Sequence, residues 1–125
     1  MTTGHCLCGK VVFEARGEPQ WVAYCHCASC RRHTGSPVTC FVNYAIEAVH
    51  FRRRPSVFES SPGVRRSFCP RCGTPVAYET DKRPGEIDIY LNAFDEPAAF
   101  MPEAHAFYAE RIPWLELRDD LPRKP

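Results

Sequence analysis

The chain has 125 residues, 44% of them apolar and 25% charged, and a formal net charge of +1. A chain of this length builds one hydrophobic core, so we expect a single domain over residues 1–125. The balanced charge argues against a nucleic-acid-binding protein, and no apolar run approaches the roughly 20 residues of a membrane helix.

The first ten residues lack the apolar stretch of a signal peptide, which predicts a cytoplasmic protein. Twelve prolines, about twice the average share, exclude a mainly helical bundle. Apolar residues alternate instead in short runs bounded by Pro and Gly, the pattern of strands. In chain order, strands are expected at 10–16, 20–24, 37–44, 65–68, 75–79 and 86–92, with edge strands at 104–108 and 114–117.

One short helix is predicted over residues 28–34, because Gly35 and Pro37 follow it. A hairpin is predicted from 49–51 and 56–59, with Arg52, Arg53 and Arg54 at its tip. Residues 95–102 are expected to form a loop, and 122–125 a frayed tail. The predicted fold class is all-β: small antiparallel sheets with one short helix, stapled by zinc.

Seven of the eight cysteines fall into three clusters: Cys6-Leu-Cys8, Cys25-His-Cys27-Ala-Ser-Cys30 and Cys69-Pro-Arg-Cys72. Disulfides are disfavoured, because the side chains of a Cys-x-Cys pair in a strand point to opposite sides and the cytosol reduces such bonds. A redox pair at Cys69 and Cys72 would need a following helix, and no helical period follows Cys72.

Zinc binding explains the spacing better, because zinc takes four ligands in a tetrahedron. The segment from Cys69 to Cys72, with Pro70 and Gly73, is typical of a zinc knuckle, and Cys6 with Cys8 is the other isolated pair. We therefore predict a structural zinc whose ligands are Cys6, Cys8, Cys69 and Cys72. The metal would close a loop of about 60 residues.

Three cysteines remain for a second ion: Cys25, Cys27 and Cys30. Three protein ligands and one open position are the pattern of a catalytic zinc. Alternatively, His33 supplies a fourth ligand from one helical turn further on and closes the site. His26 is a poor ligand because it lies between two ligating residues. Cys40 alternates with Val38 and Val42, so it is expected to be a small buried apolar residue.

These cysteine segments and their flanks resemble the glutathione-dependent formaldehyde-activating enzyme family, which shares its domain with centromere protein V. The resemblance covers residues 4–121 and includes Leu91-Asn-Ala-Phe-Asp95, Pro102-Glu-Ala-His105 and Pro113-Trp-Leu115. It implies a β-tent, in which antiparallel sheets meet at a zinc site. It also implies two zinc ions per chain, one structural on the four-cysteine set and one catalytic on Cys25, Cys27 and Cys30.

The resemblance implies a carbon–sulfur lyase that joins a thiol, glutathione, to a small aldehyde such as formaldehyde. Zinc held by three thiolates can accept a fourth sulfur and keep it deprotonated, so thiol activation is expected rather than carbonyl polarisation. Glutathione carries two carboxylates, and we predict that Arg31 and Arg32 bind them, with Arg65 and Arg66 as second candidates. Further candidates are His33, as a proton shuttle, and His105, as a packing residue.

Two other functions stay open at this point. A non-catalytic zinc-stapled binding module could contact phosphate through Arg52, Arg53 and Arg54, although a balanced charge predicts weak, salt-sensitive binding. Two zinc ions on seven thiolates would make the net charge about −2 and weaken this alternative further. Methionine-sulfoxide reduction would need a nucleophilic cysteine outside the metal clusters, and only Cys40 is left.

Overall fold

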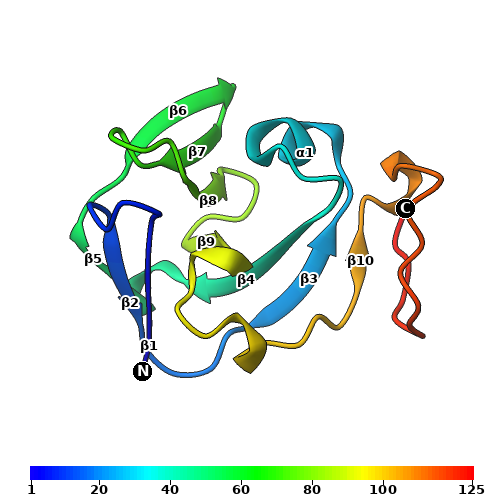
Figure 1. The fold of residues 1–125 in the computed structure, drawn as a ribbon, viewed down its shortest axis with the longest axis horizontal. Coiled ribbons are helices and arrows are strands. Elements are labelled where there is room, and N and C mark those ends of the chain that lie inside the picture. The colour runs from blue at the N-terminus through cyan, green and yellow to red at the C-terminus, as the bar shows by residue number, and fades with distance from the viewer.

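The computed structural model describes all residues, 1–125, and contains ten strands and one α-helix (Figure 1). The strands are β1 (Thr2–His5), β2 (Val12–Ala15), β3 (Trp21–Cys25), β4 (Thr39–Ala45), β5 (Val49–Arg53), β6 (Ser56–Ser61), β7 (Val64–Phe68), β8 (Pro75–Thr80), β9 (Glu86–Tyr90) and β10 (His105–Ala106). The helices are α1 (Ala28–Thr34) and the short 3-10 turns η1 (Ile46–Ala48), η2 (Leu91–Ala93), η3 (Pro97–Ala99) and η4 (Tyr108–Glu110). None of them has the length and apolar character that crossing a membrane requires.

The strands form two sheets. The smaller sheet has the order β1-β2-β5, and the larger has the order β10-β3-β4-β9-β8-β7-β6. Neighbouring strands are antiparallel except β10 and β3, which run parallel. The predicted all-β fold with one short helix is confirmed. The parallel pair was not expected; most of the chain separates β3 from β10, so no hairpin turn dictates their relative direction.

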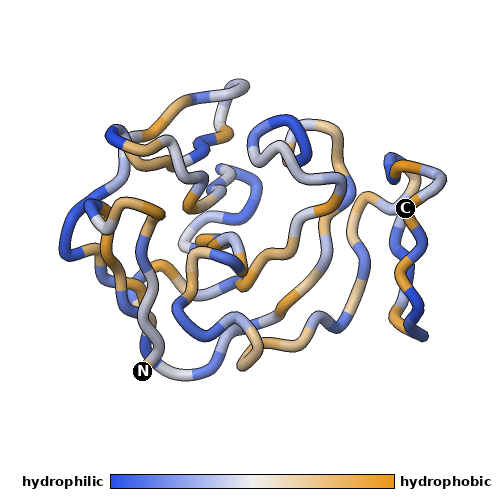
Figure 2. Tube along the Cα trace, in the orientation of Figure 1, coloured by the Kyte–Doolittle hydropathy of each residue, from blue (hydrophilic) through white to orange (hydrophobic).

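The main core consists of residues from both sheets that pack on one another. Phe13 of β2, Val42 of β4 and Ile89 of β9 are fully buried in it. Burying each such side chain contributes roughly 1.5–3 kcal/mol. Figure 2 shows hydrophilic residues at the outer end of α1 and along the connection from β5 to β6. The core therefore fixes the two sheets relative to each other and leaves α1 at the edge of the larger one.

Helix α1 has the predicted bounds, and its two caps explain them. The Sγ of Cys27, the N-cap residue, accepts a hydrogen bond from the backbone N–H of Cys30 at 3.3 Å. At the other end Gly35 adopts the left-handed conformation, with φ of 70°, and its N–H donates to the carbonyl of Arg31. Cys27 therefore caps the start of the helix, and Cys30 of the same cluster is buried in the interior.

The predicted hairpin around Arg52, Arg53 and Arg54 is wrong. Strand β5 pairs with β2 in the smaller sheet, whereas β6 pairs with β7 in the larger one. The arginines therefore lie where the chain crosses from one sheet to the other. Pro55 has no backbone N–H to donate and separates the two strands without turning them back on each other.

Other expectations near the two chain ends also fail. Strand β1 was not predicted, and no strand forms over residues 114–117, where Trp114 is exposed. The expected edge strand at 104–108 shrinks to the two residues of β10, and the loop at 95–102 contains the turn η3. The tail is ordered rather than frayed, because Lys124 donates its N–H to the carbonyl of His105 at 2.8 Å, and His105 donates to the carbonyl of Pro122 at 2.8 Å.

Candidate metal centres

Four cysteines meet where the two sheets approach each other, and we call them the quartet. Cys6 and Cys8 follow β1 in the smaller sheet, and Cys69 and Cys72 lie between β7 and β8 in the larger one. The four sulfur atoms lie within 4.8 Å of one another. The Sγ of Cys8 is 3.7 Å from those of both Cys6 and Cys69. Tetrahedral zinc with bonds of about 2.3 Å sets its sulfur ligands about 3.8 Å apart, so these atoms fit a metal ion.

Three further cysteines, which we call the trio, meet at the start of α1. Cys25 ends β3, Cys27 caps the helix, and Cys30 lies in its first turn. Their sulfur atoms also lie within 4.8 Å of one another, and those of Cys25 and Cys30 are 3.7 Å apart. The trio therefore has the spacing of metal ligands as well, but with three sulfurs instead of four.

The close spacing of the trio sulfurs suits a bound cation. The sulfurs are close enough that the thiols of Cys27 and Cys30, together with burial, raise the pKa of Cys25 well above its usual range. Three thiolates can share this space only if a positive ion offsets their repulsion. An all-sulfur donor set is typical of zinc and also of iron. The residues of both clusters therefore fit the zinc that the sequence predicted.

A cavity of about 460 Å³ opens beside the trio, and we call it the trio cavity. All three cysteines line it, with Cys27 the most exposed of them. Its remaining walls come mostly from β3, β4 and the β8–β9 region, and most of them are apolar: Trp21, Ala23, Tyr24, Phe41, Arg66, Tyr78, Thr80, Lys82, Arg83, Asp88, Ala106 and Phe107. Its volume falls in the range of small-molecule sites.

The polar groups of the trio cavity are mainly cationic. Arg83 is held by Asp88 and Glu86, so its charge is largely balanced. Arg66 is buried and has no carboxylate partner; its Nη1 lies 3.5 Å from the Sγ of Cys30 and 3.3 Å from the hydroxyl of Tyr90. Lys82 is exposed and forms no ion pair. The cavity thus combines a sulfur cluster with two cations that have no carboxylate partner, Arg66 and Lys82.

The two arginines predicted to bind substrate lie elsewhere. Arg31 donates to the backbone carbonyls of His26 and Glu110, at 3.1 and 3.0 Å, and Arg32 is exposed on the helix. Neither lines the trio cavity. Of the second candidates, Arg66 lines it, whereas Arg65 points away and pairs with Asp81. A substrate-binding role of Arg31 and Arg32 stays a prediction, and Arg66 has the better position for it.

The histidines are not among the grouped metal ligands. The Nδ1 of His33 lies 2.8 Å from the hydroxyl of Tyr90, and His33 does not line the trio cavity, which disfavours its predicted proton shuttle. His26 is buried and points to His105, with 2.8 Å between Nε2 and Nδ1, and His105 in turn contacts Asp119. Burial, helped by the nearby charges of His105 and Arg111, lowers the pKa of His26, so its ring is neutral.

The C-terminal segment braces the loop that carries the trio. Besides the contact of His105 with His26, the carboxylate of Glu110 accepts the N–H of Ala28 at 3.0 Å, and its backbone carbonyl accepts from Arg31. No periodic pattern marks residues 105–124 as a bracing element. The pairing of β10 with β3 and these contacts, which the sequence does not show, bring the segment to the trio.

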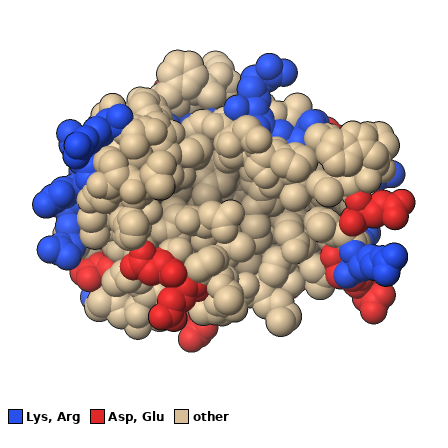
Figure 3. Space-filling model, viewed as in Figure 1, with Lys and Arg blue, Asp and Glu red and all other residues tan.

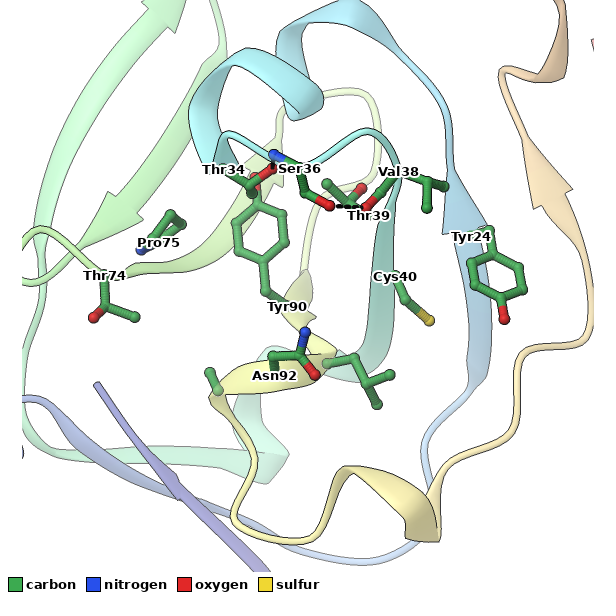
Figure 4. Close-up of a pocket in the computed structure, with 12 residues that line it drawn as sticks. Tyr24, Thr34, Ser36, Val38, Thr39, Cys40, Thr74, Pro75, Tyr90 and Asn92 are labelled. Atoms are coloured by element: carbon green, nitrogen blue, oxygen red, sulfur yellow. Dashed lines mark hydrogen bonds between the residues drawn. The ribbon is translucent and has the colours of Figure 1, made fainter. Parts of the chain in front are cut away.

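Cys40 lies outside both clusters, in a second cavity of about 390 Å³ on the opposite face of β4 from Phe41. Figure 4 shows it among Tyr24, Val38, Thr39, Tyr90 and Asn92. No charged residue lines this cavity, and the middle of the face in Figure 3 carries no charged side chain. Cys40 is half-buried rather than fully buried, and burial raises its pKa to about 12, so its thiol is a poor nucleophile at neutral pH.

These observations define a class: an all-β protein with two cysteine clusters that could each bind a metal ion. A family model described as glutathione-dependent formaldehyde-activating enzyme matches residues 1–110. The chain therefore belongs to the glutathione-dependent formaldehyde-activating enzyme family. The resemblance seen in the cysteine motifs is confirmed.

Among solved structures, three chains match. One is the crystal structure of a Rhodobacter sphaeroides protein, a structural-genomics target, with a TM-score of 0.62 and 19% sequence identity. The match covers 74% of this chain and 87% of that chain. This likeness supports the fold alone. No curated protein matches the chain.

Proposed function

We propose that the protein joins a thiol to a small aldehyde in the trio cavity, as a zinc-dependent carbon–sulfur lyase acting in the direction of synthesis. One observation carries the proposal: the trio offers three sulfurs beside a cavity, whereas the quartet offers four. Three protein ligands beside an accessible space are typical of catalytic zinc, and four are typical of structural zinc.

The chain's own residues would bind and orient the substrates. When bound, zinc supplies the Lewis acidity that keeps a thiol deprotonated near neutral pH. Arg66 offers its charge to a carboxylate of a thiol such as glutathione. The hydroxyl of Tyr90 accepts a hydrogen bond from Arg66 and holds the guanidinium beside Cys30.

The reaction needs no oxidant or reductant. A carbon–sulfur bond forms between the thiol sulfur and the carbonyl carbon, the C=O π bond breaks, and the thiol proton ends on the new hydroxyl oxygen. Orientation of the two reactants in one cavity is the main contribution expected from the protein.

The experiment compares Cys27→Ser with the matched control Cys40→Ser, which changes the one cysteine outside both clusters. Zinc content and circular dichroism are measured, and formation of S-hydroxymethylglutathione is followed by NMR. The proposal predicts two zinc ions in the wild type and in Cys40→Ser. Cys27→Ser should retain its fold, hold one zinc and lose the activity. Unfolding of Cys27→Ser, or wild-type protein that binds zinc without speeding adduct formation, would favour two structural sites.

A further inference from the structure

Phe107 is unusual in both backbone and exposure. It is the only residue other than glycine with a positive φ, at 53°. A left-handed conformation is costly for a bulky residue. Its side chain is 53% exposed, so packing in the core does not compensate for this cost. Phe107 instead lines the trio cavity, together with Cys25 and Cys27.

The surrounding structure forces this conformation. The carbonyl before Phe107, that of Ala106, accepts the N–H of His26 at 3.0 Å. The residue after it, Tyr108, donates its N–H to the carbonyl of Lys124 at 2.8 Å. Its own carbonyl accepts the N–H of Glu110 at 3.0 Å. Strain that is held in place beside a reactive cluster points to a role in function.

Aromatic side chains make up much of the wall of the trio cavity. Trp21, Phe41, Tyr78 and Phe107 all contribute to its walls. The rings of Phe41 and Tyr78 pack against each other, and Arg83 lies over the ring of Trp21, 5.5 Å from its centroid. Phe107 has no ring or cation packed on it, so its face is free to stack on a flat apolar group.

We infer that the aldehyde taken by the trio cavity carries an aromatic ring and an anionic group, and that Phe107 selects it by stacking on the ring. The inference rests on the proposed function, because it names the substrate class of the same site. Lys82 is exposed and forms no ion pair, so it is the cation available to the anionic group, while Arg66 is the one expected to meet the thiol. The bond changes are those given above, with the aryl aldehyde as the carbonyl partner.

The first test measures binding without turnover. The probe is 4-(hydroxymethyl)benzoate, an aryl carboxylate whose alcohol a thiol cannot attack, and isothermal titration calorimetry measures its affinity for the zinc-loaded protein. Saturable binding by the wild type is expected, and about tenfold weaker binding by Phe107→Gly. The matched control is Phe58→Ala, which removes another exposed phenylalanine that does not line the cavity and should leave the affinity unchanged.

The second test measures selectivity and stability. The ratio of kcat/KM for 4-formylbenzoate to that for formaldehyde is expected to fall about tenfold in Phe107→Gly. Glycine and asparagine adopt the left-handed conformation more readily, so Phe107→Gly and Phe107→Asn should unfold at the same or a higher denaturant concentration than the wild type. A packing role would predict the opposite shift for both variants.

The outcomes separate the inference from the proposed function. If the aryl carboxylate binds through Phe107 but no adduct forms with any aldehyde, the proposed function fails. The inference that the cavity binds aromatic anions is then retained. If formaldehyde reacts but the aryl carboxylate does not bind, the inference is overturned and the proposed function stands. Unfolding of both Phe107 variants, or a wild-type dimer that they dissociate, would also overturn the inference.

Discussion

The quartet and the trio use the same ligand atom in different surroundings. The quartet draws two cysteines from a connection in each sheet and has four sulfurs within metal-binding distance. The trio draws three cysteines from six consecutive residues and borders a cavity that contains cationic and aromatic side chains. The comparison indicates that the number of ligands and the groups around them, rather than the ligand type, distinguish the two clusters.

Their supports also differ. The quartet is held by turns whose backbone N–H groups donate to sulfur, as Val11 does to Cys6 at 3.2 Å and Cys72 does to Cys69 at 3.4 Å. The trio depends on a distant segment, since His105 and Glu110 brace its loop. A structural role for the quartet and a catalytic role for the trio follow as proposals, and three changes test the contrast.

The largest effect is expected from Cys69→Ser. This residue is buried where the two sheets meet, and structural zinc contributes on the order of 10 kcal/mol to folding. A domain has about 5–15 kcal/mol of stability in total, so the variant should unfold. Circular dichroism and zinc content measure this, with Cys40→Ser as the control. A folded Cys69→Ser that keeps the trio metal and the activity would break the contrast.

An intermediate effect is expected from Arg66→Met. Loss of a hydrogen bond from a charged group costs about 1.5–3 kcal/mol, so kcat/KM for glutathione should fall roughly 10- to 100-fold. The control is Arg65→Met, because the neighbouring side chain pairs with Asp81 outside the cavity; about a twofold change at most is expected. Steady-state kinetics measures both variants. A larger loss in Arg32→Met than in Arg66→Met would favour the arginines predicted from the sequence.

The smallest effect is expected from Asp119→Asn, which loosens the brace of the trio. Partial burial of Asp119 raises its pKa, but hydrogen bonds from Arg123 and His105 outweigh this and lower the pKa to about 2. The ionised carboxylate therefore stabilises the fold above about pH 4, and this contribution is lost as the pH falls toward 2.

The measurement for this variant is the thermal midpoint between pH 6 and pH 2.5. The wild type should exceed Asp119→Asn by a few degrees at pH 6, and the difference should narrow below about pH 4. Asp120→Asn is the matched control and should follow the wild type, because Asp120 is exposed and forms no ion pair. A difference that stays constant down to pH 2.5 would contradict the assigned pKa.

Much of the fold follows from local sequence signals. The bounds of α1 were predictable because Gly35 ends the helix, and β9 was predictable because Ile87 and Ile89 alternate with polar residues. Strand β1 has no such alternation. Its Gly4 is needed because any side chain there would collide with the carbonyl of Ala93 and the ring of Phe13, a contact that sequence alone does not show.

The surroundings of the site were harder to predict than its cysteines. Cysteine spacing indicated both clusters, because the ligands of each pair or trio are close in sequence. Arg31 and Arg32 follow Cys30 directly in the sequence, which favoured them as substrate-binding residues. The geometry of the helix, however, turns both side chains away from the cavity. Arg65 and Arg66 are neighbours in β7, so their side chains point to opposite faces of the sheet. Which of the two faces the cavity depends on the register of β7 with β8, which the sequence does not show.

Cadmium NMR of the metal-substituted protein can distinguish a thiol-binding trio from a closed quartet. Two resonances are expected, one from the quartet and one from the trio, and only the trio resonance should shift when glutathione is added. Cys27→Ser should remove the responsive resonance, and Cys40→Ser should retain it. If neither resonance responds to glutathione, or if the quartet resonance shifts instead, the assignment of the trio as the site of thiol binding is contradicted.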